Sequence, residues 1–167
     1  MTTPMAATTR PHGLPFHHPA TLLATWFGAG LLPKVPGTWG SLAALPFAWY
    51  IAAAFDATGL IVAAAIVFAI GCWAAGTVSR AGGVRDPGFI VIDEVAAQWL
   101  VLAAAPTDPL AYAVGFVLFR VADIVKPFPA NWADRALHGG LGIMLDDVFA
   151  ALYAGLALLV LVRFGLV

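Results

Sequence analysis

The stretch GGLGIMLDDVFAALYAGLALLVLV, residues 139–162, places two adjacent aspartates directly before the last long apolar run of the chain. The run itself, Val148–Val162, carries no charged residue. A carboxylate at the edge of a hydrocarbon layer costs free energy, and two neighbouring like charges cost more. The stretch therefore predicts a membrane helix whose polar end has a function that requires Asp146 and Asp147.

Composition supports a membrane protein. Of 167 residues, 62% are hydrophobic and only 10% are charged, and the mean hydropathy is +0.92, far above that of an ordinary soluble domain. The net charge of −1 provides no overall field that would attract nucleic acid. The single cysteine, Cys72, excludes an intramolecular disulfide and a zinc site built from several cysteines.

Apolar runs along the chain predict an all-α fold, a polytopic transmembrane helical bundle with about five crossings. The predicted crossings are Ser41–Phe55, Gly59–Val78, Phe89–Ala105, Pro109–Ala122 and Val148–Val162. Several are shorter than the roughly 20 residues that span a bilayer, so flanking residues must extend them. A shorter run, Ala20–Leu32, predicts a re-entrant or interfacial helix. Residues 1–19 are predicted to be a mobile tail, and residues 20–167 a single membrane-embedded domain.

Alternate threading of the five runs separates the charges. One side receives most of the basic residues, namely Lys34, Arg80, Arg85, Lys126 and Arg135, whereas Asp56, Asp108 and Arg163 fall on the other. Basic loops favour the cytoplasmic side. The same threading places four polar segments on the cytoplasmic face, PKVPGTWGS, RDPGFIVIDE, FRVADIVKPFP and HGGLGIMLDD. We expect these segments to form one site.

Five carboxylates lie in these segments. Asp93 and Glu94 fall inside an apolar run, where an ionised acid costs about 2.5–3.5 kcal/mol unless it is compensated. A buried ion pair with Arg85 or Arg120 is one explanation, and a bound ligand is the other. Asp123 lies between Arg120 and Lys126 at spacings of three, on one helix face, although these bases could also be a simple membrane anchor.

Two glycine-containing segments complete the predicted site. Gly139, Gly140 and Gly142 precede Asp146 and Asp147, which could also interact only with a helix dipole. In VPGTWGS, Gly37 and Gly40 allow a tight loop, and Thr38 and Ser41 add hydroxyls where a helix begins, which is typical of an anion site. The alternative is that Ser41 caps the helix.

In combination, these motifs resemble one family. VPGTWGSLAALP, IVIDE, FRVADIVKPFP, the DR of Asp134 and Arg135, and HGGLGIMLDD occur in the order and with the approximate spacing of phosphatidylglycerophosphatase A, an integral membrane lipid phosphatase of bacteria. The resemblance runs from about Ala20 through the last apolar run. It implies magnesium-dependent hydrolysis of the phospholipid phosphatidylglycerophosphate to phosphatidylglycerol and inorganic phosphate, in phospholipid biosynthesis at the bacterial cytoplasmic (inner) membrane.

The residues suit this chemistry. Carboxylates are the usual protein ligands of Mg²⁺, and phosphate hydrolysis requires positioning and charge neutralisation. We predict that Mg²⁺ is held by Glu94, Asp123, Asp146 and Asp147. Asp93 is predicted to be a ligand or a base, and His138 either a general acid or the partner of a local hydrogen bond. The predicted substrate-binding residues are Lys34, Gly37, Thr38, Ser41, Arg120, Lys126, Asp134, Arg135, Gly139 and Gly140.

Other functions agree less well with the pattern. A transporter would place acids near the membrane midplane, often between internal repeats, and no repeat is present. A lipid-binding or assembly protein has no need of five acids beside a glycine loop. A lipid phosphotransferase remains the nearest alternative, and an aspartyl-phosphate intermediate remains compatible with the sequence. The sequence predicts no nucleic-acid partner and no particular oligomeric state.

Overall fold

The computed structural model describes residues 13–167, apart from the side chain of Asp134. All regular elements in this range are helical. They are α1 (Pro19–Ala24), the short 3-10 helix η1 (Ala29–Leu31), α2 (Pro36–Gly82), α3 (Ile92–Leu102), α4 (Pro109–Val125), α5 (Ala130–Ala136) and α6 (Gly139–Arg163). The predicted all-α fold is therefore confirmed for the described residues.

The long helix α2 reverses direction at Asp56. The backbone of Asp56 has φ 56° and ψ −165°, which is not helical. Gly40, before the bend, lies against Val91. Gly71, after the bend, lies against Ile92, the residue that follows Val91 in the chain. In a straight helix these two glycines would be about 46 Å apart, at 1.5 Å per residue. The two arms of α2, residues 36–55 and 57–82, therefore form a helical hairpin, and both its ends lie beside the start of α3.

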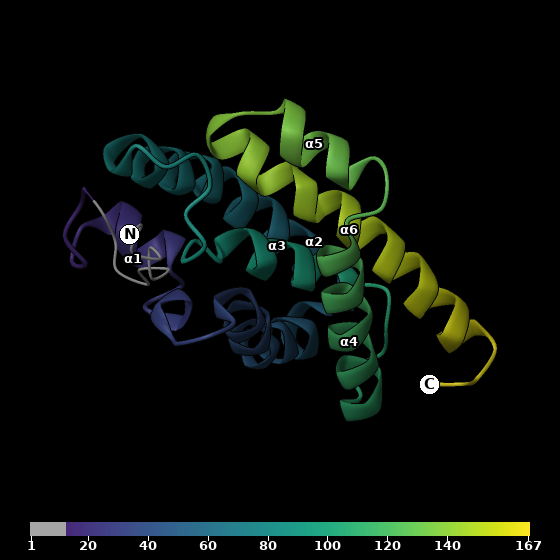
Figure 1. Cartoon of the computed structure of the whole chain (residues 1–167). Helices are drawn as coiled ribbons and strands as arrows, with labels where there is room; N and C mark the ends of the chain where they lie inside the picture. The colour runs from purple at the N-terminus through teal and green to yellow at the C-terminus, as the bar shows by residue number, and fades with distance from the viewer. Residues whose placement is uncertain (1–12) are drawn as a thin grey trace.

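Helix α3 lies at the centre of the bundle, with α2, α4 and α6 packed around it (Figure 1). Its buried side chains form much of the main core, and Trp99 Nε1 donates a hydrogen bond of 3.0 Å to the carbonyl oxygen of Ala44 in the first arm of α2. On its other side, Ala97 and Val101 pack with Phe119 of α4 and Leu158 of α6. This central position lets the first turn of α3 meet the ends of three other helices.

Glycines bring the second arm of α2 against the start of α6. A Cβ atom on Gly140 would overlap the carbonyl oxygen of Cys72, and one on Gly71 would overlap the side chain of Met144. Gly76 lies on the same contact, since its Cβ position is 3.1 Å from the nitrogen of Gly140. Small residues of this kind allow helix backbones to approach closely. The contact fixes where α6 begins relative to α2 and α3.

Two helices, α2 and α6, are long and apolar enough to cross a membrane. The predicted five crossings are not supported. The third apolar run gives only α3, whose 11 residues rise about 16 Å, because residues 89–91 and 103–105 lie outside the helix. The fourth run gives α4, whose 17 residues rise about 26 Å, less than the roughly 30 Å of a bilayer core. The first two runs are the arms of α2.

The run Ala20–Leu32 does not form one continuous helix. It is divided between α1 and η1, and the chain turns at Trp26 and Phe27, both of which have positive φ. The carbonyl oxygen of Ala24 accepts a hydrogen bond of 2.8 Å from the backbone N–H of Val91, which ties this turn to α3. Of the predicted tail, residues 1–12 lie outside the described part of the chain, and Leu14 packs against the main core. The place of this region relative to a membrane stays a prediction.

We expect Gly140→Ala to destabilise the protein, because the added methyl group forces α6 away from the Cys72 carbonyl group. Overpacking of this kind costs about 1–3 kcal/mol. The measurement is the thermal unfolding midpoint of the purified protein in detergent. Gly88→Ala is the matched control, since a Cβ atom at Gly88 meets nothing within 4 Å. Equal midpoints for the two variants would contradict the close α2–α6 contact.

Candidate active site

The four polar segments meet at one end of the bundle. The amino-terminal end of α2, the start of α3, the end of α4 and the start of α6 supply the side chains. Arg120 of α4 contacts Ser41 of α2 and Glu94 of α3, and Lys126 at the end of α4 contacts Asp146 of α6. The expected convergence of these segments is therefore present in the structure.

Three carboxylates form the centre of this site. Asp93 and Glu94 lie in the first turn of α3, and Asp147 lies in α6. Each offers one oxygen atom, and these atoms lie within 4.8 Å of one another. The exposed fraction is 8% for Asp93 and 3% for Asp147, and it is 13% for the side chain of Glu94. We call Asp93, Glu94 and Asp147 the carboxylate centre.

The charge of the carboxylate centre is compensated only in part, by Arg120, whose Nη1 lies 3.8 Å from Glu94 Oε1. Asp93 Oδ1, Glu94 Oε2 and Asp147 Oδ2 are buried and have no hydrogen-bond partner among the described residues. Burial, followed by repulsion from Glu94, raises the pKa of Asp93 well above its usual range. Burial also raises the pKa of Glu94, to about 8. A group of acids with raised pKa values and unused oxygen atoms is suited to bind a cation.

Arg120 borders the carboxylate centre on one side. Its Nη1 lies 2.9 Å from Asp123 Oδ2 and 3.8 Å from Glu94 Oε1, and it donates a hydrogen bond of 3.3 Å to Ser41 Oγ. The predicted spacing of Arg120 and Asp123 on one helix face is thus confirmed. Asp123 belongs to the same site, because the Arg120 nitrogen that pairs with it also pairs with Glu94.

Lys126 borders the centre through Asp146. Lys126 Nζ lies 2.6 Å from Asp146 Oδ2, and the αL backbone of Lys126, with φ 46°, ends α4 at this point. The predicted metal ligands therefore occupy two kinds of position. Glu94 and Asp147 belong to the carboxylate centre, whereas Asp123 and Asp146 each pair with a basic side chain beside it. Asp93, predicted as a ligand or a base, completes the centre.

Gly37 packs directly on this charged cluster. A Cβ atom there would overlap Glu94 Oε1 and would lie 3.1 Å from the guanidinium nitrogens of Arg120. Ser41 Oγ donates a hydrogen bond of 2.9 Å to the carbonyl oxygen of Gly37. Ser41 does not cap α2, because the N-cap residue is Val35 and its side chain makes no capping bond. Ser41 instead links the first turn of α2 to Arg120.

The other predicted substrate-binding residues have varied positions. Lys34 is exposed, and Thr38 is half-buried in the first turn of α2. Gly140 packs against α2, as described above, while Gly139 has φ 71° and lines a pocket beside Asp146. Arg135 is exposed, and the side chain of Asp134 lies outside the described atoms.

His138, the predicted general acid, is the N-cap residue of α6 and is exposed. Its Nδ1 lies 3.0 Å from the carbonyl oxygen of Ala136. A carbonyl oxygen only accepts, so Nδ1 carries a hydrogen in this contact and Nε2 is the nitrogen left for a substrate. The local hydrogen bond considered from the sequence is therefore present, and it is compatible with a role in proton transfer.

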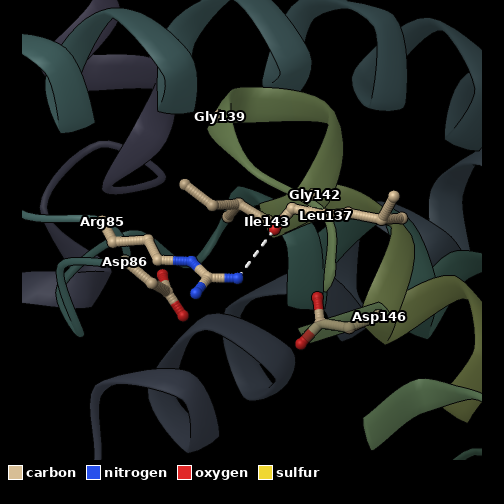
Figure 2. Close-up of a pocket in the computed structure, with 7 residues that line it drawn as sticks. All are labelled: Arg85, Asp86, Leu137, Gly139, Gly142, Ile143 and Asp146. Carbon is tan, nitrogen blue, oxygen red and sulfur yellow. Dashed lines mark hydrogen bonds between the residues drawn. The ribbon is translucent and has the colours of Figure 1, made fainter. Parts of the chain in front are cut away.

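Sequence reasoning did not assign two residues that border the site. Arg85 and Asp86, in the α2–α3 connection, line a pocket together with Gly139, Gly142 and Asp146 (Figure 2). Arg85 Nη2 donates hydrogen bonds of 2.7 Å to the Arg135 carbonyl oxygen and 2.9 Å to that of Leu137. Both residues belong to RDPGFIVIDE, the segment that also contains Asp93 and Glu94. This proximity in the sequence could have indicated that they border the site.

A comparison with protein families gives a match to phosphatidylglycerophosphatase A over residues 22–162. The chain belongs to the phosphatidylglycerophosphatase A family. This match includes every residue of the carboxylate centre and both basic neighbours, Arg120 and Lys126. The resemblance predicted from the motifs is therefore confirmed.

Two named relatives agree with this family, and a third has the name of a related lipid phosphatase. The chain is 44% identical over 138 residues to phosphatidylglycerophosphatase A of Escherichia coli, covering 82% of this chain and 80% of that protein. It is 41% identical to phosphatidylglycerophosphatase A of Haemophilus influenzae, over 82% of this chain and 85% of that protein. A protein of Bacteroides thetaiotaomicron, provisionally named a phosphatidylinositol-3-phosphatase, is 38% identical over 87% of this chain and 91% of its own. No solved structure gives a significant match.

A double-mutant cycle tests the ion pair beside the centre. Arg120→Met leaves Asp123 without its cation, so we expect a loss of about 3–5 kcal/mol in the free energy of unfolding. Asp123→Asn in the same chain removes the uncompensated charge and should recover part of that loss. The measurement is unfolding of the wild type, both single variants and the double variant in detergent. Strictly additive effects would show that the two side chains do not interact.

Proposed function

We propose that this protein is a membrane lipid phosphatase that hydrolyses phosphatidylglycerophosphate to phosphatidylglycerol and inorganic phosphate in phospholipid biosynthesis. The observation that carries the proposal is the carboxylate centre, which lies within the part of the chain that matches the family. The two relatives named phosphatidylglycerophosphatase A support the substrate. Phosphate monoesters hydrolyse extremely slowly in water, so an enzyme must mainly position the ester and neutralise its charge.

We further propose that the carboxylate centre holds Mg²⁺. The residues present fit this ion, because three acids offer oxygen atoms within 4.8 Å of one another and three buried carboxylate oxygens have no partner. Mg²⁺ prefers oxygen ligands and keeps positions for water and substrate phosphate. Asp93, Glu94 and Asp147 would hold it, with Asp123 and Asp146 adjacent. When bound, Mg²⁺ would supply positive charge that polarises the phosphoryl group.

Basic and polar side chains would hold the phosphate beside this centre. Arg120 already contacts Ser41 and Asp123, and its buried Nε has no partner among the described residues, so the guanidinium group retains a donor for a phosphate oxygen. Gly37 leaves room for the backbone to approach the same point. Exposed Lys34 and Arg135 would attract the anionic headgroup from the surrounding surface.

Two proton transfers complete the proposed reaction. Water loses a proton as its oxygen bonds to phosphorus, and we propose that Asp93 accepts this proton through the carboxylate oxygen that does not hold Mg²⁺. The phosphorus–oxygen bond to the lipid breaks, and the leaving alkoxide takes a proton. We propose His138 in its imidazolium form as the donor: it gives the proton on Nε2 to the alkoxide and keeps the proton on Nδ1, which is held by the Ala136 carbonyl oxygen.

The Bacteroides relative supports a second candidate substrate. Its provisional name indicates a phosphoinositide, which is also a phosphate monoester on a lipid headgroup. The same carboxylate centre would serve both substrates, because the chemistry at phosphorus is identical. Relative rates on the two lipids decide between them.

A phosphate-release assay tests the function and the metal. We expect the purified protein to release phosphate from phosphatidylglycerophosphate in mixed micelles, with water as sole acceptor, and to stop when a chelator is added. Glu94→Gln and Asp147→Asn should lower kcat by at least about 1000-fold, because each removes a charged ligand of the proposed Mg²⁺, the ion that would neutralise the phosphoryl oxygens.

Asp56→Asn is the matched control for these variants. It makes the same acid-to-amide change at the bend of α2, with a side chain of the same size and shape as aspartate. This control should keep wild-type activity. Near-normal rates for Glu94→Gln and Asp147→Asn would contradict the assignment of the carboxylate centre. Activity that persists in chelator would contradict the metal.

We also propose that the protein crosses the bacterial inner membrane more than once, with the site on the cytoplasmic face. The apolar helices α2 and α6 and the basic residues at the site end support this orientation. In a Cys72→Ser background, a cysteine at Thr107 should react with an impermeant maleimide in intact spheroplasts. A cysteine at Ala136 should react only after permeabilisation. The opposite labelling pattern would place the site on the periplasmic face of the membrane.

A further inference from the structure

We propose that Arg85 is a positioning residue that holds His138 where it can protonate the leaving group. This inference rests on the proposed function, because it concerns the residue that serves there as the general acid. Arg85 lies in the α2–α3 connection, whereas His138 is the N-cap residue of α6. Arg85 acts through the backbone that joins α5 to α6, and not by contact with the substrate.

The Arg85 guanidinium group bonds to the backbone on both sides of Ala136. Its Nη2 donates a hydrogen bond of 2.7 Å to the Arg135 carbonyl oxygen. The same nitrogen donates a second, of 2.9 Å, to the Leu137 carbonyl oxygen, as Figure 2 shows. The carbonyl oxygen between these two, that of Ala136, lies 3.0 Å from His138 Nδ1. The carbonyl group that orients the imidazole ring therefore has a neighbour bonded to Arg85 on each side.

These three carbonyl groups lie where a helix cannot supply their partners. The last four carbonyl groups of an α-helix lack a donor within the helix, and α5 ends at Ala136, with Leu137 as its C-cap residue. Helix α5 has only seven residues, a length at which a helix is marginal by itself. The side chains of Arg85 and His138 are thus the donors that fix the end of this short helix.

The backbone of Arg85 is itself anchored to α2. Ser79, in the last turns of α2, is buried, and its Oγ shares its hydrogen between the carbonyl oxygens of Val84, at 2.7 Å, and Arg85, at 2.9 Å. The same α2–α3 connection leads into the first turn of α3, which carries two acids of the carboxylate centre. The position of the general acid is therefore tied to the segment that supplies the centre.

This position matters because of the reaction that His138 performs. When the phosphorus–oxygen bond to the lipid breaks, its electron pair stays on the lipid oxygen, which takes the proton from Nε2. A general acid must lie within hydrogen-bond reach of the atom that it protonates, and a misplacement of about 1 Å can lower the rate by about 100-fold. His138 is exposed, so packing does little to fix its ring, and the hydrogen bond from Nδ1 orients it.

A double-mutant cycle in kcat tests the inference. The substrate is phosphatidylglycerophosphate in mixed micelles, and the full-length proteins are the wild type, Arg85→Met, His138→Ala and the double variant. We expect Arg85→Met to lower kcat about 30-fold and His138→Ala about 100-fold or more. The double variant should stay within about twofold of His138→Ala, because Arg85 has nothing to position once the imidazole ring is absent. In Arg85→Met, KM should change by less than about twofold, since the phosphate binds beside Arg120.

A conservative variant and a matched control accompany the cycle. Lysine lacks the planar fork of arginine but still donates, so Arg85→Lys should lose only about fivefold in kcat. If Arg85→Met fails to fold, Arg85→Lys completes the cycle, and its loss should likewise disappear in the His138→Ala background. Arg163→Met makes the same change at an exposed position at the opposite end of α6 and should keep the wild-type kcat.

Other outcomes separate this inference from the proposed function. Losses that multiply in the double variant would overturn the inference, because Arg85 would then act on the site independently of His138. A wild-type kcat in Arg85→Met would overturn it as well. A wild-type kcat in His138→Ala would remove both the general acid and this inference and leave the phosphatase activity in place. If the wild type released no phosphate, the proposed function would fail together with this inference.

Discussion

Repulsion among buried carboxylates is the constraint on which the rest of the structure depends. Asp93, Glu94 and Asp147 are held together although no basic side chain among residues 13–167 lies within hydrogen-bonding distance of them. The surrounding helices reduce the free-energy cost of bringing these acids together but do not remove it. Arg120 and Lys126 neutralise the two adjacent acids, and the positive end of the α3 dipole lies at Asp93 and Glu94, in its first turn. What is left is a group of acids whose raised pKa values disfavour the charged form, and a bound cation would favour it.

Helix contacts keep this centre assembled against its own repulsion. The first turn of α3 is enclosed between the two arms of α2, through Gly40 at Val91 and Gly71 at Ile92. Gly140 brings α6 against the second arm, and Asp147 lies about two turns further along the same helix. The acids are therefore placed by backbone contacts between rigid elements. Such placement is more exact than loops allow, and it explains why glycines are numerous near the site.

The sequence predicted the location and composition of the site better than its architecture. The alternate placement of the apolar runs across a bilayer put Glu94, Arg120 and Asp147 at helix ends on the same side of the bundle. Few helix ends lie on one side of a small bundle, so these residues were predicted to meet. The predicted five crossings are not supported, because an apolar run does not reveal where its helix begins. Residues 89–91, for example, belong to the third run but lie outside α3. Long-range pairing was also beyond the sequence. Nothing in the spacing of Lys126 and Asp146 indicates their contact, and the packing role of Gly140 depends on Cys72, far away in the chain.

The bend of α2 sets the length of each arm. Gly40 of the first arm lies against Val91, and Gly71 of the second arm lies against Ile92. The number of residues between Asp56 and each glycine is therefore fixed by these contacts. An extra residue within an arm would rotate everything beyond it by about 100° and turn Gly40 or Gly71 away from α3. Residues added at the bend itself leave the two arms and their contacts with Val91 and Ile92 unchanged. The tip of the hairpin is thus the part of α2 that can vary in length while the chemistry at its opposite end stays the same.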